Sequence, residues 1–291
     1  MNKNNLIERF LDYLKANDRS PSTIKSYTCD LYLFAKWFDK NNHEELKANK
    51  ITPTDLRQYK QYLVDYPMKP NSINRKITVL KVFIHWLLDS GRIQQRFPLP
   101  KMVKNTNVSP RWLNKNQQNY MLRHLEKYAN QRDYAIIKLL LNTGLRINEL
   151  INLKWSDVRM TDKKGAITIR YSKANRYRDV PLNKDARNAF ISLGFAEMVG
   201  KDQTILNGQR GRLSVRGVQL MINRRFEHTE LEFISPHVLR HTFCKNLVNA
   251  GVSLEKIALL AGHESVDTTR LYCQPSFEDL SDSVEKISEE E

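Results

Sequence analysis

Cysteine, glycine, proline and long apolar runs are all scarce in this chain of 291 residues. The three cysteines are an odd number without a CxxC pair, so we expect neither a disulfide framework nor a zinc ribbon. Glycine and proline number ten each, too few for a collagen-like or low-complexity chain. No run of about 18 apolar residues occurs, and the first residues lack the apolar core of a signal peptide. We therefore expect no membrane span and a cytoplasmic location.

Positive charge is abundant. The chain has 47 Lys and Arg against 32 Asp and Glu, a formal net charge of +15. Residues 1–107 carry +9, residues 108–275 carry +12, and residues 276–291 carry −6. Neutralising phosphates is the usual use of such a surplus, so double-stranded DNA is a candidate partner. A basic protein without a polyanionic partner is the alternative, which charge alone does not exclude.

The first hundred residues have helical periodicity. Apolar residues recur three or four apart in four segments, and the starts of the last three are marked by the capping sequences Ser20-Pro21, Thr52-Pro53 and Pro70-Asn71-Ser72. We predict a helical domain over residues 1–105. The far face of the fourth segment carries Arg75 and Lys76, which are either DNA contacts or a solvated face.

The second half combines helices with a small sheet. Residues 106–111, within a proline-containing basic stretch, are the predicted linker, and residues 112–275 the second domain. Alternation of Ile167, Ile169 and Tyr171, and of Val180 and Leu182, predicts a small antiparallel sheet within residues 156–182. Helices are expected at 183–199, 214–226, 237–250, 253–261 and 265–272. The predicted fold class is mainly α with a small antiparallel β-sheet.

Four ordered motifs occur in the second domain. They are TGLRINEL at 143–150, HVLRH at 237–241, LAGH at 260–263, and Tyr272, nine residues after the last histidine. A basic segment, SKANRYRDVPL at 172–182, lies between the first two. The set resembles the tyrosine recombinase (phage integrase) family, whose motifs read TGLRxxEL, HxLRH, LGH and Tyr, with a hairpin GKGxKxRxVPL. The helical first domain looks like the core-binding domain of this family, so the resemblance spans nearly the whole chain and is greatest to simple Xer-like or transposon-resolution members.

The resemblance implies a catalytic set, and the residue types suit its chemistry. Arg146 and Arg240 would hold the phosphate, because guanidinium groups match phosphate oxygens bidentately and stay charged. Tyr272 would attack the phosphorus, and such a phenol needs help to lose its proton. His263 would donate a hydrogen bond to a phosphate oxygen, and His237 would accept the tyrosine proton or orient the site. Lys173 would protonate the leaving 5′ oxygen, and Glu149 would orient the other side chains. The hairpin reads SKA where GKG is usual, which weakens the alignment of Lys173.

The resemblance further implies an enzyme without cofactor or metal. The bond energy would be kept in a 3′-phosphotyrosine, so neither ATP nor a metal ion would be needed, and the sequence has no P-loop and no HxH cluster. It also implies a homotetramer on two DNA sites, with a possible accessory protein or second recombinase. Phe277, Leu280, Val284 and Ile287 form an apolar stripe on an acidic tail, which predicts a helix over residues 276–291. In the family such a helix looks like the element that docks on a neighbouring protomer, so we predict that contact here, with packing on its own domain as the alternative.

Each residue also has a plainer interpretation. Arg146 and Glu149 could form an ordinary surface ion pair, and Lys173 could be a solvated turn residue. His237 and His241 are spaced like metal ligands but lack a third ligand, so we expect His241 to be a packed helix residue. Further plain interpretations are a helix-end cap at His263, a half-buried side chain at Tyr272, and contacts of Arg176 and Arg178 with DNA backbone phosphate or solvent.

Three functions remain open at this stage. The sequence favours a site-specific DNA recombinase acting in integration, excision or resolution. The alternatives are a DNA-binding regulator whose catalytic set is unused, and a strand transferase of the type IB topoisomerase kind that acts on one duplex.

Overall fold

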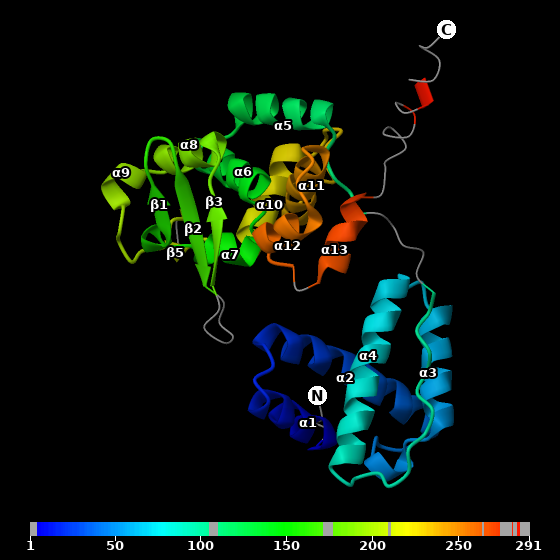
Figure 1. The fold of residues 1–291 in the computed structure, drawn as a ribbon. Helices are drawn as coiled ribbons and strands as arrows, with labels where there is room; N and C mark the ends of the chain where they lie inside the picture. The colour runs from blue at the N-terminus through cyan, green and yellow to red at the C-terminus, as the bar shows by residue number, and fades with distance from the viewer. Residues whose placement is uncertain are drawn as a thin grey trace. The chain divides into compact units, whose positions relative to one another are not determined.

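The structure is a computed structural model. It describes residues 5–104, 110–170, 177–208, 211–263, 265–273, 281 and 284–285. The chain divides into two compact units, Met1–Asn107 and Val108–Glu291, each with an apolar core of its own (Figure 1). Helices dominate and the sheets are small and antiparallel, which confirms the predicted fold class. None of the described helices has the length and hydrophobicity needed to cross a membrane.

The first unit is a four-helix domain. Its helices are α1 (Asn5–Ala16), α2 (Pro21–Asn42), α3 (Pro53–Asp65) and α4 (Pro70–Asp89), with the short 3-10 turn η1 (Ala48–Lys50) before α3. Two of the three predicted signals cap their helices, because the side chains of Ser20 and Thr52 accept hydrogen bonds from the first turns of α2 and α3. At α4, Pro70 occupies the first turn as predicted, but no side chain caps the helix. The core is aromatic, with Phe10, Phe34 and Phe83 fully buried.

The second unit begins with five helical elements and a sheet. They are α5 (Lys115–Tyr128), α6 (Gln131–Thr143), α7 (Ile147–Asn152), the turn η2 (Trp155–Asp157), β1 (Val158–Met160), β2 (Gly165–Arg170), β3 (Tyr177–Pro181) and α8 (Lys184–Ser192). The strands form an antiparallel sheet in the order β1-β2-β3, which confirms the sheet predicted within residues 156–182. Opposite pairs such as Ile167 and Val180 face the core.

Among the described residues, the remaining elements of the unit are helical apart from one short strand pair. Its elements are α9 (Phe195–Met198), β4 (Asn207–Gly208), β5 (Gly211–Arg212), α10 (Val215–Phe226), α11 (Pro236–Asn249), α12 (Leu254–Ala261), α13 (Val266–Arg270) and the 3-10 turn η3 (Leu271–Cys273). The single helix expected over residues 183–199 is interrupted, because Gly194 adopts a left-handed conformation with φ of 94° and separates α8 from α9. The β4–β5 hairpin was not predicted.

The helix α6 organises the second unit. It packs against α8 on one side and α11 on another, and α11 also contacts α12 and η3 (Figure 1). Ala135, Ile136, Leu139 and Leu140 of α6 are fully buried in the core. The carboxyl end of α6, the helix α11, the end of α12 and η3 therefore meet in one region. These elements, together with α7 and the turn between α6 and α7, carry the described residues of the four motifs.

Candidate active site

The turn between α6 and α7 carries the first predicted arginine. Gly144 follows α6 in a left-handed conformation with φ of 60°, which glycine adopts without a steric penalty. The turn places Arg146 directly before α7. Its backbone N–H donates to one carboxylate oxygen of Glu149 at 2.8 Å, and its guanidinium donates to the other at 3.1 Å. The Arg146 side chain is 38% exposed, so it remains accessible from the surface.

The second predicted arginine lies on α11 and is buried. Arg240 donates hydrogen bonds to the carbonyl oxygens of Gly144 and, at 2.7 Å, of Ala261. Burial, reinforced by the positive charge of Arg146, lowers the pKa of the Arg240 guanidinium. A guanidinium nevertheless stays charged at neutral pH. The fold thus places two guanidinium groups from separate motifs close enough for the charge of one to affect the pKa of the other.

The end of α12 holds these arginines in place. Gly262 turns the chain there with φ of 68°. The last carbonyl groups of a helix have no partner within it, and they carry partial negative charge that favours cations. Three consecutive carbonyl oxygens accept from three arginines of other elements: Leu260 from Arg178 at 3.2 Å, Ala261 from Arg240 at 2.7 Å, and Gly262 from Arg146 at 2.5 Å.

The predicted nucleophile is buried beside two histidines. Tyr272 in η3 is 1% exposed, and its hydroxyl lies 2.6 Å from Nδ1 of His241 on α11. The ring of His263 is stacked with the Tyr272 ring at a centroid distance of 6.2 Å. Nδ1 of His263 lies 2.8 Å from the hydroxyl of Thr269, which holds this imidazole to α13.

The pKa values of His241, His263 and Tyr272 are shifted toward the neutral forms of these side chains. Burial, with the neighbouring charges of His237 and Arg240, lowers the pKa of His241 to about 4, and burial with the arginine charges lowers the pKa of His263 to about 4. Burial raises the pKa of the Tyr272 phenol, although the charge of Arg240 opposes this. At neutral pH both imidazoles are therefore uncharged and the phenol keeps its proton.

The two histidines of the HVLRH motif have different surroundings. His237 is exposed at the surface, and its partial desolvation, followed by the charges of Arg240 and Arg146, lowers its pKa. Its ring centroid lies 6.4 Å from that of His241, and it is His241 that contacts the Tyr272 hydroxyl. His241 is packed on α11 as expected, and beyond that expectation it also contacts the Tyr272 hydroxyl. The i,i+4 spacing was the available signal, because it places both imidazoles on one face of α11.

The hairpin residues divide into two groups. Lys173 and Arg176 lie outside the described residues. Arg178, predicted to bind DNA phosphate or solvent, has a side chain only 11% exposed and forms hydrogen bonds with both carboxylate oxygens of Glu149. The prediction that Arg178 contacts DNA phosphate or solvent is therefore wrong, because its guanidinium is paired with the carboxylate of Glu149.

The N-terminal candidates also surround a carboxylate. Asp30 of α2 is 4% exposed and forms ion pairs with both Arg75 and Lys76 of α4. The Lys76 ammonium lies 2.7 Å from Asp30, and only 9% of the residue is exposed, so the prediction of a solvated or DNA-contacting lysine was wrong. The Arg75 side chain is 48% exposed and remains a DNA-contact candidate.

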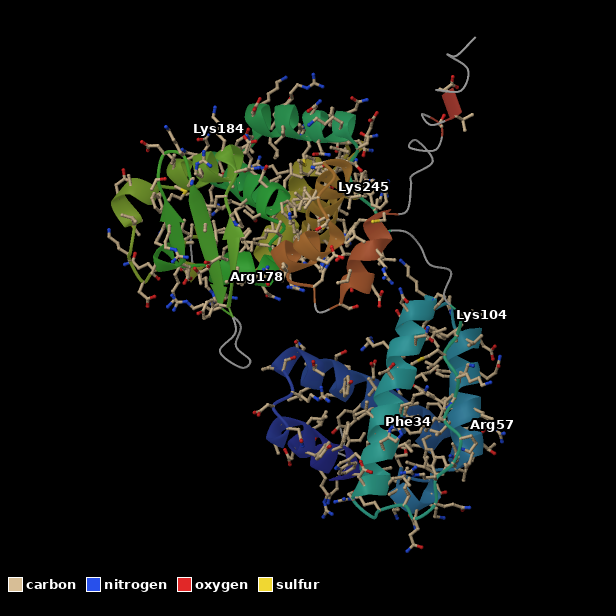
Figure 2. The ribbon with its side chains drawn as sticks, in the orientation of Figure 1. Phe34, Arg57, Lys104, Arg178, Lys184 and Lys245 are labelled. Carbon is tan, nitrogen blue, oxygen red and sulfur yellow. The ribbon has the colours of Figure 1, made fainter. Side chains whose placement is uncertain are left out.

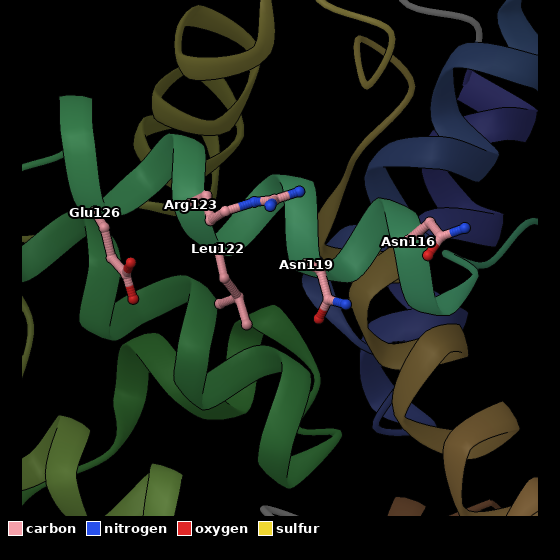
Figure 3. Close-up of a pocket in the computed structure, with 5 residues that line it drawn as sticks. All are labelled: Asn116, Asn119, Leu122, Arg123 and Glu126. Atoms are coloured by element: carbon pink, nitrogen blue, oxygen red, sulfur yellow. The ribbon is translucent and has the colours of Figure 1, made fainter.

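Two further observations concern metal ions and a surface pocket on α5. Within the described residues, no three His, Cys, Asp or Glu side chains are grouped so as to hold a metal ion. A shallow pocket lies along α5, lined by Asn116, Asn119, Leu122, Arg123 and Glu126 (Figure 3). None of the predicted site residues contributes to it.

Two family models match the chain in succession. Residues 111–279, more than half of the chain, match the model described as the phage integrase family. The chain belongs to this family. Residues 7–91 match the phage integrase N-terminal SAM-like domain, so the family match extends to the first helical unit. The resemblance inferred from the motifs is confirmed.

Curated relatives of this phage integrase family member span most of its length. It is 28% identical to a tyrosine recombinase XerC of Chlorobaculum parvum, over 96% of this chain and 93% of the relative. It is 29% identical to a TnP I resolvase of Bacillus thuringiensis, over 96% of this chain and 99% of the relative. The family and these relatives support a site-specific recombinase.

Solved structures share the fold. The Tn1549 transposon integrase in complex with circular intermediate DNA matches with a TM-score of 0.72 at 18% identity, over 96% of this chain and 98% of the other. The XerH site-specific recombinase bound to a palindromic difH substrate matches with a TM-score of 0.73 at 21% identity, over 96% and 83%. At these identities the likeness concerns the fold.

Proposed function

We propose that this protein is a site-specific DNA recombinase that cuts and rejoins duplex DNA through a 3′-phosphotyrosine. The observation that carries the proposal is the convergence of Arg146, Arg240, His263 and Tyr272 around the end of α12. Four separate motifs supply these groups, which are those needed to hold a phosphate and attack it.

The chemistry follows from these groups. Arg146 and Arg240 bind the non-bridging oxygens of the scissile phosphate, and His263 donates a further hydrogen bond. The Tyr272 oxygen forms a bond to phosphorus while the bond from phosphorus to the 5′ oxygen breaks. The phenolic proton passes to a neutral imidazole, and Lys173 protonates the 5′ oxygen. Reversal with a 5′ hydroxyl of another strand releases the tyrosine and joins the strands, so no ATP and no metal ion are consumed.

Two histidines are candidates for the imidazole that accepts the phenolic proton. The family resemblance gives the role to His237, whereas the contact of 2.6 Å belongs to His241. His237→Gln and His241→Gln separate them. Replacing the true proton acceptor should slow formation of the covalent adduct without weakening DNA binding. It should also remove the pH dependence of that rate that the pKa of this histidine causes.

The assembly proposed is a homotetramer on two DNA sites. The helical first unit and the catalytic unit both bind the duplex, with Arg75 as a phosphate or base contact. Residues 276–291 dock on a neighbouring protomer, and a second recombinase or an accessory protein is a further possible partner. Removing residues 276–291 should leave the binding of single sites intact but abolish pairing of sites, measured by gel shift. Unchanged pairing would reject the tail contact.

A covalent trapping experiment tests the function. The binding site is first selected from a random duplex pool with the whole protein, and a nick is then placed next to the scissile position so that cleavage becomes irreversible. Wild type incubated with EDTA and without ATP should form a denaturation-resistant adduct. Tyr272→Phe should bind equally and form none, while Tyr128→Phe, at an exposed tyrosine of the same unit, should act as wild type.

The outcomes distinguish the rival functions. Binding without any adduct would support a DNA-binding regulator and reject the enzyme. An adduct with relaxation of supercoiled plasmid, but no exchange between two sites on that plasmid, would support the topoisomerase-like alternative. Exchange between the two sites supports the recombinase.

A further inference from the structure

Arg178 occupies an unusual position for a charged residue. On β3 it shares a face with Val180, which is fully buried, because residues two apart in a strand point to the same side. Its side chain, 11% exposed, extends toward α12 and reaches Glu149 of α7 and Leu260 of α12 (Figure 2). A cation on an inward face is costly unless it is paired and hydrogen-bonded.

The partners of Arg178 are parts of the candidate active site. Its two terminal nitrogens donate to the two carboxylate oxygens of Glu149 at 3.0 and 2.9 Å, and Nε donates to the carbonyl oxygen of Leu260 at 3.2 Å. Glu149 accepts at the same time from the backbone and the guanidinium of Arg146. One carboxylate thus links a buried guanidinium to a more exposed one.

We propose that Arg178 is a positioning residue for strand cleavage, fixing Glu149 and the end of α12 so that Arg146 is aligned for the scissile phosphate. The inference rests on the proposed function. It assigns the two arginines different tasks, since the Arg146 side chain is 38% exposed and can reach DNA, whereas Arg178 is turned inward. Bidentate pairing fixes the orientation of both planar groups, which a single ion pair does not.

The charge state of Glu149 supplies a separate signature. Burial tends to raise the pKa of this carboxyl, but the hydrogen bonds and charge of Arg178, followed by those of Arg146, bring it below its ordinary value. The charged groups that face Glu149 are Arg146 before α7, Arg178 on β3 and, more weakly, Arg240 on α11. Without Arg178 the burial effect gains weight, the pKa rises, and the carboxylate is lost at a higher pH.

The test compares Arg178→Met with Arg159→Met. Arg159 is a matched control, because it belongs to the same sheet and pairs with Asp179 at 3.0 Å, but its side chain is 69% exposed. On the nicked duplex, Arg178→Met should slow adduct formation about 100-fold, the effect of displacing a reacting group by about 1 Å. Its dissociation constant for DNA should stay within about threefold of wild type, a change of less than about 0.7 kcal/mol. Arg159→Met should retain the rate of wild type.

Two further measurements separate positioning from mere folding. The acid limb of the rate profile should shift to higher pH in Arg178→Met and not in Arg159→Met. The double variant Glu149→Gln/Arg178→Met should be about as slow as the slower single variant, because Arg178 acts through Glu149. If the rate losses of the two single variants multiply in the double variant, Arg178 acts on DNA independently of Glu149, and the proposal is overturned.

Arg178→Lys covers the case in which the methionine variant fails to fold. Lysine keeps the charge but not the planar fork, so the rate should fall while the acid limb stays in place. Full activity of Arg178→Lys, or equal losses in the Arg178→Met and Arg159→Met variants, would refute the positioning role. Absence of an adduct with wild type would instead refute the proposed function.

Discussion

The packing of α11 against the turn after α6 gives a quantitative prediction for Gly144→Ala. Gly144 has φ of 60°, and an added Cβ would lie 2.2 Å from Cδ1 and 2.6 Å from Cε1 of Phe243 on α11. Carbon atoms in contact are normally about 3.5–4.0 Å apart, so the ring must move by more than about 1 Å. Phe243 is partly buried and packs against the buried cluster that contains Cys244 and Tyr272, which limits that movement.

Two contributions add in this variant. Alanine in a left-handed conformation costs roughly 1–2 kcal/mol. Overpacking against a ring costs roughly 1–3 kcal/mol more. We expect Gly144→Ala to lower the free energy of unfolding of the catalytic unit by about 2–5 kcal/mol.

The matched control is Gly251→Ala, at the end of α11. Gly251 has φ of 74°, and nothing lies within 4 Å of its added Cβ, so only the backbone contribution of about 1–2 kcal/mol is expected. Both variants are compared with wild type by urea denaturation, followed by circular dichroism and fluorescence. The double variant Gly144→Ala/Phe243→Leu should regain part of the loss, because leucine lacks the clashing ring.

The activity of the same variant provides a second readout. The carbonyl of Gly144 accepts a hydrogen bond from Arg240, so movement of α11 away from this turn disturbs the phosphate-binding guanidinium. Gly144→Ala should therefore slow adduct formation more than Gly251→Ala does. Equal losses of stability in Gly144→Ala and Gly251→Ala would refute the reasoning about Phe243. If Gly144→Ala/Phe243→Leu regains no stability, the strain does not come from the Phe243 ring.

Three other predictions concern buried polar groups. The pKa values of His241 and His263 lie near 4, below the ordinary 6.5, so the stability that is present above pH 6.5 should decline as the pH falls from 6.5 toward 4. A melting temperature that does not change over this range, or that changes equally in His241→Gln, would contradict this. Asp30→Ala leaves the buried Lys76 unpaired and should cost about 3–5 kcal/mol in urea denaturation, with Lys76→Met recovering much of it in the double variant. Tyr272→Phe removes one hydrogen bond and should cost only about 1 kcal/mol, so its circular dichroism should match that of wild type and its inactivity should not reflect unfolding.

Local signals made the helices predictable. The oxygen of Ser20 and the oxygen of Thr52 cap α2 and α3 at the positions where Ser-Pro and Thr-Pro precede apolar periodicity. The sheet followed from the alternation around Ile167 and Val180, which lie opposite each other. These features depend on residues close in sequence, so a single chain contains the information. The interruption at Gly194 depends on one left-handed residue, which periodicity does not register.

The motif residues were predictable by their order, but their partners were not. Lys76 was assigned to a DNA contact or a solvated face because its acidic partner, Asp30, is 46 residues away and on another helix. Arg178 was assigned to DNA phosphate or solvent for the same reason, since Glu149 is 29 residues away. Whether a cation points to solvent or to a buried carboxylate is decided by tertiary packing, which charge patterning does not encode.

The nature of the acceptors at the end of α12 has a consequence for how this site tolerates mutation. The oxygens of Leu260, Ala261 and Gly262 belong to the main chain, so substituting a side chain cannot delete them. A carboxylate anchor such as Glu149 disappears with one codon change, whereas these three persist as long as the backbone follows the same path. Sequence drift around the helix end is therefore buffered, and the vulnerable position is Gly262, whose conformation at φ of 68° sets that path.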